Sequence, residues 1–138
     1  MIIFDTDILT LYTRGHPRIR QRAEQEDDEI AISLITQIEV LLGRFDFILK
    51  AADGEQLKRA QVYLVQSERD LAKHVIVPID ENAAAEFDKH RIDKKLKSIG
   101  RRDLLIACIA LAQRARLVTR NLKHFRLVPG LIVENWAD

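Results

Sequence analysis

Short apolar runs rich in β-branched residues alternate along this chain with longer segments whose apolar residues recur every three or four positions. The short runs are typical of strands buried on both faces of a sheet, and they lie at residues 2–4, 29–34, 75–77, 117–119 and 132–133. The longer segments predict helices at residues 8–12, 18–26, 38–49, 57–71, 80–97 and 102–114. Because strands that alternate with helices form parallel sheets covered on both faces, the sequence predicts an α/β fold.

The composition predicts one domain over residues 1–138. The chain is 47% hydrophobic and 31% charged, with no repeat and no Pro-, Gly- or Ser-rich linker, which suits a single core. Its only cysteine, Cys108, excludes a disulfide scaffold and suits a reducing compartment. The longest apolar stretch, 104–112, is too short to span a bilayer, and the N-terminus carries no secretory signal. We therefore expect a cytoplasmic protein without a membrane segment.

Positive charge is concentrated in one part of the chain. Residues 89–126 contain twelve Lys or Arg and two acids, whereas the other hundred residues contain ten bases and nineteen acids. A basic block of this kind is either a solvated surface or a contact surface for a polyanion such as nucleic acid. The sequence leaves both interpretations open.

Three acids and one amide are expected near the carboxyl ends of the strands, where open parallel sheets bind ligands. Asp5 follows the first strand and Glu39 lies one helical turn after the second. Asp103 opens the helix before the fourth strand, and Asn121 follows that strand. Three converging carboxylates repel each other unless cations neutralise them, and such hard oxygen ligands favour Mg²⁺ or Mn²⁺. Asp5, Glu39 and Asp103 are therefore candidate metal ligands for phosphodiester chemistry.

Most of these residues also have a structural interpretation. Thr36 and Glu39 have the spacing of a capping box. Asp103 near a helix N-terminus complements the helix dipole, and Asn121 suits a turn. For Asp7, capping of the next helical turn is favoured over metal ligation. Asp5 has no helix upstream to cap, which favours a functional role.

Five segments of the chain resemble, in order and spacing, the motifs of PIN-domain nucleases, and within them the VapC toxins of type II toxin–antitoxin pairs. These segments are residues 3–9, 32–43, 102–107, 117–125 and 128–136. The resemblance implies a three-layer α/β/α sandwich around a mostly parallel sheet of four to five strands. It further implies Mg²⁺-dependent RNA cleavage, with Mn²⁺ as a possible substitute, inhibition of growth, a cognate antitoxin and a homodimer.

The resemblance also assigns roles to individual residues. Asp5, Glu39 and Asp103 match the metal-binding acids of the family, and Thr119 matches a threonine implied to hold the catalytic water or the metal shell. Asn121 falls where many members have a fourth acid, so we expect a second Mg²⁺ to bind weakly or only with substrate phosphate. Asp7 replaces a common Asn or Ser. Four cations of the basic block are expected to contact RNA phosphates, namely Arg101, Arg102, Arg120 and Lys123.

Other functional classes stay open. One is a module of the same fold that binds nucleic acid or protein without catalysis. A haloacid-dehalogenase-type phosphatase would use Asp5 and Asp7 as its Asp-x-Asp motif. Such an enzyme also requires a paired Gly-Asp…Asp motif after a strand, whereas Asp103 of this chain precedes a helix. Mg²⁺-stimulated RNA cleavage distinguishes these readings. The apolar residues of segment 36–73 either pack in the core or form a face for an antitoxin helix or a second copy.

Overall fold

The computed structural model describes residues 1–138 and contains one five-stranded sheet with the order β3-β2-β1-β4-β5. The strands are β1 (Ile2–Phe4), β2 (Ile30–Ser33), β3 (Val75–Val77), β4 (Arg116–Val118) and β5 (Ile132–Glu134). All four neighbouring pairs are parallel, and Phe4 is level with both Ile32 and Val118. The predicted parallel sheet is confirmed. Because the expected edge strand at residues 132–133 is present as β5, the sheet has five strands.

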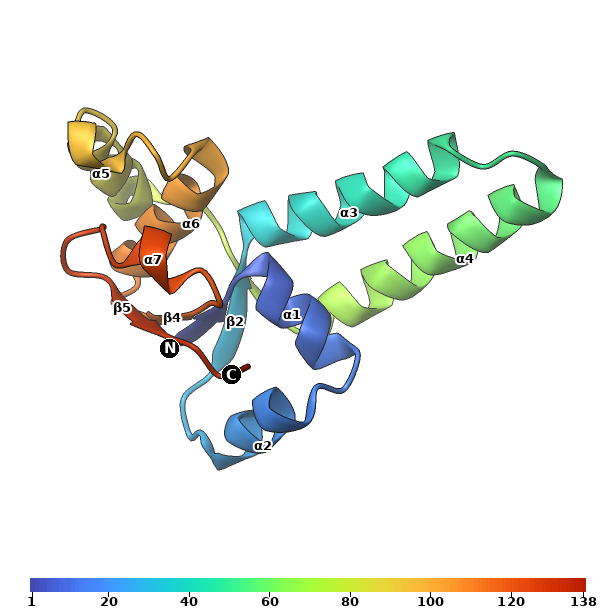
Figure 1. Cartoon of the computed structure of the whole chain (residues 1–138), viewed down its shortest axis with the longest axis horizontal. Helices are drawn as coiled ribbons and strands as arrows, with labels where there is room; N and C mark the ends of the chain where they lie inside the picture. The colour runs from blue at the N-terminus through green and yellow to red at the C-terminus, as the bar shows by residue number, and fades with distance from the viewer.

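Helices cover both faces of this sheet (Figure 1). They are α1 (Thr6–Thr13), α2 (Pro17–Gln25), α3 (Leu34–Leu49), α4 (Gly54–Leu71), α5 (Glu81–His90), α6 (Arg101–Ala112) and α7 (Leu122–Phe125), with a 3-10 turn, η1 (Lys94–Leu96). The core is correspondingly divided. Ile3 and Leu117 pack with α5 and α6, whereas Ile2 and Phe4, the neighbours of Ile3 in β1, pack with α1 and α2. Successive residues of a strand point to opposite faces, so the three-layer α/β/α sandwich is confirmed.

Two predicted elements differ from the structure. The helix expected over 80–97 ends at His90, and η1 follows separately. Asp93 causes the break, because its carboxylate accepts a hydrogen bond from the Lys95 backbone N–H at 2.9 Å and so competes with helical pairing. Asn121 suits a turn in the sequence, and in the structure it leads into the short helix α7.

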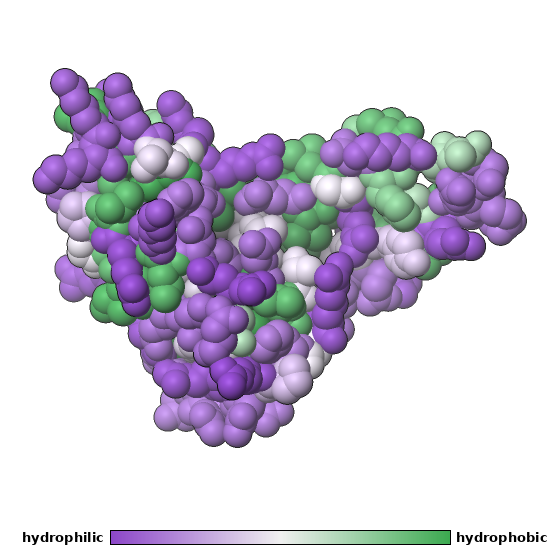
Figure 2. Space-filling model, in the orientation of Figure 1, coloured by the Kyte–Doolittle hydropathy of each residue, from purple (hydrophilic) through white to green (hydrophobic).

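The hairpin of α3 and α4 projects from the sandwich (Figure 1). Several of its large apolar side chains are exposed, including Leu42, Phe45, Phe47, Leu49, Leu57 and Val62, and Figure 2 shows hydrophobic surface along it. No helix in the structure has both the length and the apolar character needed to cross a membrane.

Candidate metal-binding site

The strand order reverses between β1 and β4, at the centre of the sheet. β1 runs into Asp5 and β4 runs into Thr119, and these two ends are level. Ligands of open parallel sheets bind beyond the carboxyl ends of the strands at such a switch point. The fold therefore places Asp5 at the position where a ligand is expected.

A cavity of about 140 Å³ opens at this point. It is lined by Asp5, Thr6, Asp7, Glu39, Asp103, Ile106, Asn121 and Phe125. Four of these residues are acids and none is basic. The structure thus brings Asp5, Glu39, Asp103 and Asn121 together, as the sequence predicts. Thr119 does not line the cavity.

Asp5 is only 8% exposed and is held from two sides. One carboxylate oxygen accepts the backbone N–H of Ile8 at 2.9 Å, which makes Asp5 the N-cap of α1. The other accepts the hydroxyl of Thr119 at 2.5 Å, and that hydroxyl accepts the backbone N–H of Asn121 at 2.9 Å. Burial raises the pKa of Asp5 to about 6, since a buried carboxylate loses its hydration. Thr119 is therefore a positioning residue for Asp5.

Glu39 is held by α1 rather than by a capping box. Its Oε1 accepts the hydroxyl of Thr6 at 3.0 Å, and the Thr6 hydroxyl lies 3.0 Å from that of Thr36. The N-cap of α3 is Ser33, whose hydroxyl accepts the Thr36 backbone N–H at 3.2 Å. The capping-box interpretation of Thr36 and Glu39 is wrong, because the helix begins earlier than the motif requires.

Asp103 lies in the first turn of α6 and faces the same cavity. Its pKa is raised, first by burial and then by the negative charge of Glu39. A hydrogen bond from the Asn121 side chain partly offsets this rise, and the amide nitrogen of Asn121 lies 2.9 Å from Nδ1 of His124. Asn121 precedes α7 but makes no side-chain cap bond, so its side chain is turned to the cavity and His124 rather than to a turn.

Asp7 also lines the cavity, as an exposed residue in the first turn of α1. The expectation that it caps a helix is wrong, because Asp5 occupies the N-cap. Among the residues that sequence reasoning missed, Thr6 holds Glu39 and His124 contacts Asn121. The sequence does contain a signal that Asp7 belongs to the site. Asp7 follows Asp5 by two residues at the junction of a strand and a helix, where both side chains reach the carboxyl edge of the sheet.

The four predicted phosphate ligands lie outside this cavity lining. Arg102 is nearest, with its guanidinium 3.5 Å from Oε2 of Glu39. Arg120 lies 3.9 Å from the Asp138 carboxylate, and Arg101 packs 4.9 Å from the ring centre of Phe87. Lys123 is exposed on α7. Of the four cations, the structure therefore places only Arg102 against a residue of the cavity.

The carboxylate oxygens of this cavity suit a divalent cation that prefers hard oxygen ligands. Two carboxylates with raised pKa, Asp5 and Asp103, share the cavity with Glu39 and Asp7. No three of the acidic, His or Cys side chains lie close enough to hold one ion directly. Mg²⁺ tolerates this, because it keeps several waters and takes only one or two carboxylates from the protein.

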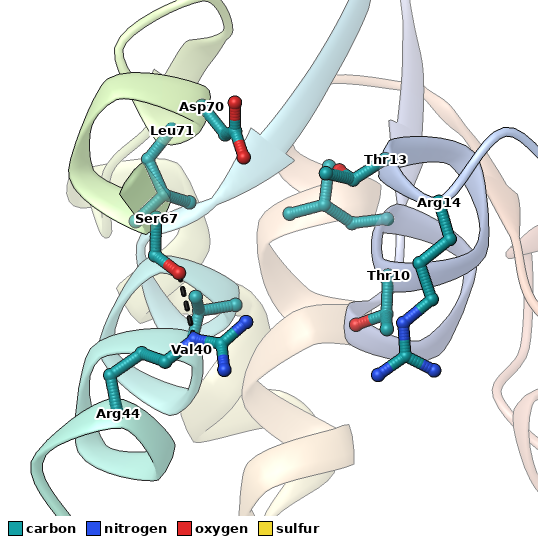
Figure 3. A pocket seen from close by; sticks show the side chains of 9 residues that line it. Thr10, Thr13, Arg14, Val40, Arg44, Ser67, Asp70 and Leu71 are labelled. Carbon is teal, nitrogen blue, oxygen red and sulfur yellow. Dashed lines mark hydrogen bonds between the residues drawn. The ribbon is translucent and has the colours of Figure 1, made fainter. Parts of the chain in front are cut away.

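A different cavity, of about 90 Å³, lies between α1 and the α3–α4 hairpin, and it carries none of these acids (Figure 3). On the hairpin side of this cavity, Arg44 of α3 donates a hydrogen bond to the Ser67 hydroxyl of α4 at 2.8 Å. Leu9, Val40 and Leu71 line its apolar part. The chemistry of this cavity is that of a contact surface rather than of a reaction centre.

Comparison with known proteins identifies the family to which this fold belongs. The PIN domain family matches residues 2–131. The chain therefore belongs to the PIN domain family. Its relatives there are VapC proteins: Ribonuclease VapC2 of Rickettsia felis is 32% identical over 97% of this chain and 96% of its own length, and Ribonuclease VapC1 of Haemophilus influenzae is 30% identical over 98% and 97%. The resemblance to the VapC branch is thus confirmed.

A solved structure gives the same result. The structure of VapBC2 from Rickettsia felis bound to a DNA fragment from their promoter superposes with a TM-score of 0.76. The identity is 30%, and 99% of each chain is covered. The similarity extends over the whole sandwich, including the α3–α4 hairpin.

Proposed function

We propose that this protein is a Mg²⁺-dependent endoribonuclease that acts in the cytoplasm as the toxin of a type II toxin–antitoxin pair and inhibits translation and growth. One observation carries the proposal: four carboxylates surround a cavity at the switch point of the sheet, and no basic residue lines it. Arg102 neutralises only Glu39 in this cluster, so an added cation would stabilise the remaining carboxylates. The relatives named as ribonucleases support RNA as the substrate.

The residues of the site have separable tasks in this mechanism. Asp5 and Asp103 would hold the metal, and Glu39 would add negative charge beside it; the chemistry that Mg²⁺ supplies when bound is a more acidic water and neutralised charge on a phosphodiester oxygen. Mn²⁺ suits the same oxygen ligands. Thr119 and the Ile8 N–H fix the two oxygens of Asp5 before any ligand arrives, and Thr6 does the same for Glu39.

The surroundings of the site would bind and orient the RNA. Ile106 and Phe125 form an apolar wall, which strengthens electrostatic interactions at the carboxylates by excluding water. Arg102 lies at the edge of the cavity on Glu39, where a substrate phosphate can exchange for that carboxylate. Arg101, Arg120 and Lys123 would attract the RNA backbone from further away.

Cleavage of labelled RNA by the purified protein, with Mg²⁺ and with EDTA, tests the proposal. Asp5→Asn and Asp103→Asn should each lower the Mg²⁺-dependent rate at least about 100-fold, because each removes an anionic ligand. Glu81→Gln, which neutralises an exposed acid of α5, is the matched control and should cleave normally. Wild-type rates in both site variants would exclude this site, and metal-independent cleavage would exclude the mechanism.

We also propose that the protein forms a homodimer and binds a cognate antitoxin. The exposed apolar residues of the α3–α4 hairpin support this proposal, and so do neighbours solved as VapBC complexes. Sedimentation equilibrium of the protein alone and of the protein co-expressed with its genomic neighbour tests both parts. A monomer that forms no complex would contradict them.

A further inference from the structure

A basic cavity adjoins the proposed site on the other side of α6. Its volume is about 170 Å³, and it is lined by residues of α5, η1 and the start of α6. These residues are His90, Arg91, Asp93, Leu96, Lys97, Gly100, Arg101 and Leu104. Three of them are exposed cations and one is an acid. Figure 2 shows hydrophilic side chains projecting from this end of the molecule.

The three cations of this cavity are available to a ligand. Lys97 and Arg101 form no ion pair, and Arg101 is fixed only by its packing on Phe87. Arg91 pairs with Asp88 at 3.2 Å, but both side chains are more than half exposed, and such pairs contribute little. The carboxylate of Asp93 is already bonded to the Lys95 N–H. The cavity therefore has an excess of positive charge that the fold does not use.

The geometry of α6 relates this cavity to the carboxylates. Gly100, Arg101 and Leu104 line the basic cavity, whereas Asp103 and Ile106 line the carboxylate cavity. At 3.6 residues per turn these two sets lie on opposite flanks of the first turns of the helix. The helix is about 10 Å across, so the two cavities are separated by a short span of nucleic acid backbone.

We infer that Arg91, Lys97 and Arg101 form a subsite for a backbone phosphate of the RNA, a few nucleotides from the bond that is cut. This inference rests on the proposed function and extends it. In this arrangement the RNA backbone crosses the start of α6, with the scissile phosphate at Asp103 and a second phosphate in the basic cavity. A cation in this subsite contacts a phosphate that does not react. It therefore contributes to binding of substrate and transition state alike.

The first test measures RNA binding in EDTA, by anisotropy of a labelled single-stranded RNA of mixed sequence at increasing salt. Arg91→Gln and Lys97→Gln should each weaken binding several-fold, and the slope of log affinity against log salt should fall by about one per cation. Lys94→Gln is the matched control, since it removes the same charge from exposed η1 without touching the cavity. Melting curves verify that all variants fold.

The second test locates the phosphate. In an RNA that the wild type cleaves, single phosphates are replaced in turn by neutral methylphosphonates. One position near the cut should raise KM several-fold in the wild type and clearly less in Lys97→Gln, where one of the three cations is already gone, while kcat stays unchanged in both. If the wild type cleaves RNA but Arg91→Gln and Lys97→Gln behave like Lys94→Gln, the subsite is excluded and the proposed function stands. If the wild type cleaves no RNA, the proposed function fails and the subsite with it.

Discussion

Two clusters of acids lie at opposite ends of the central strands, and β4 connects them. At its start, Arg116 lies 2.7 Å from Glu26 and 2.8 Å from Glu134, with Asp28 also within reach. Beyond its end, Thr119 holds Asp5 beside the other carboxylates. Hydrogen bonds from Arg116 lower the pKa of Glu26, whereas burial raises that of Asp5 to about 6.

The difference between the clusters is a built-in cation. In the first cluster the guanidinium groups of Arg116 and Arg22 neutralise the acids, so the fold itself completes the interaction. In the carboxylate cavity no lining residue is basic, and the only guanidinium against it, that of Arg102, is mostly exposed and pairs with Glu39 alone. Asp5, Asp7 and Asp103 are therefore expected to destabilise the free protein until an added cation arrives. Acids in a cluster therefore do not by themselves indicate a site, but acids that lack a resident cation do.

The largest expected effect comes from removing one negative charge from the carboxylate cavity without changing its shape. Glu39→Gln keeps an oxygen that can accept the Thr6 hydroxyl but cannot neutralise a cation. We expect RNA cleavage to fall at least about 100-fold with an unchanged melting temperature. Cleavage assays and thermal melts of wild type, Glu39→Gln and Glu81→Gln measure this. Normal activity in Glu39→Gln would mean that its charge has no part in the reaction.

The second prediction uses the pKa of Asp5, which is raised in the folded state. The folded protein therefore binds the proton more tightly than the unfolded chain, and the stability this provides is complete below about pH 4 and is lost as the pH rises through about 6. At pH 8 without metal, Asp5→Asn should increase the free energy of unfolding by about 1–3 kcal/mol, the upper value corresponding to the full shift. At pH 4 the gain should be absent.

Denaturant unfolding at both pH values measures this effect, and Asp53→Asn is the matched control. Asp53 is an exposed N-cap of α4 whose carboxylate accepts the Gln56 N–H. The control variant should show no gain in stability at pH 8. Equal changes in the free energy of unfolding of Asp5→Asn at pH 4 and pH 8 would show that the buried charge of Asp5 does not destabilise the free protein.

The third prediction removes the more buried of the two cations of the first cluster. Arg116→Met leaves Glu26 and Glu134 with only the half-exposed Arg22 as a common partner, and we expect the melting temperature to fall by about 5 °C. RNA cleavage at low temperature should be retained, because this cluster lies at the end of the sheet away from the proposed site. Lys58→Met, which breaks only the exposed pair with Glu55, should have little effect. An unchanged melting temperature in Arg116→Met would contradict the assigned role.

The sequence predicts much of this arrangement because its strongest signals are local. Apolar runs ending in acids located Asp5 and the parallel sheet, and the motif spacing located Glu39 and Asp103. The failures come from competition between neighbours: Ser33 caps α3 ahead of Thr36, and Asp5 takes the cap expected of Asp7. Contacts between distant segments, such as the Thr6 hydroxyl on Glu39, leave no periodic pattern in a sequence. The strand order that creates the switch point is likewise set by packing of the whole chain.

The smallest expected effect concerns Asn121, which lines the carboxylate cavity where many relatives are expected to carry a fourth acid. Two divalent ions bring four positive charges, whereas Asp5, Glu39 and Asp103 supply three negative ones. Asp7 is exposed at the edge of the cavity, so water screens its contribution. We therefore expect one tightly held Mg²⁺ in the free protein, with a second ion arriving only with the charge of a substrate phosphate.

Asn121→Asp should then tighten Mg²⁺ binding several-fold in the absence of RNA and allow cleavage at lower Mg²⁺. Calorimetric titration of the free protein measures the affinity, and Asn82→Asp, at an exposed position of α5, controls for net charge. The new carboxylate would lie beside His124, whose Nδ1 now contacts the Asn121 amide, so the ring competes with the metal for the new oxygens and the gain stays modest. Two equally tight Mg²⁺ sites in the unmodified protein, or no tightening in Asn121→Asp, would show that charge at this position does not set how many ions bind.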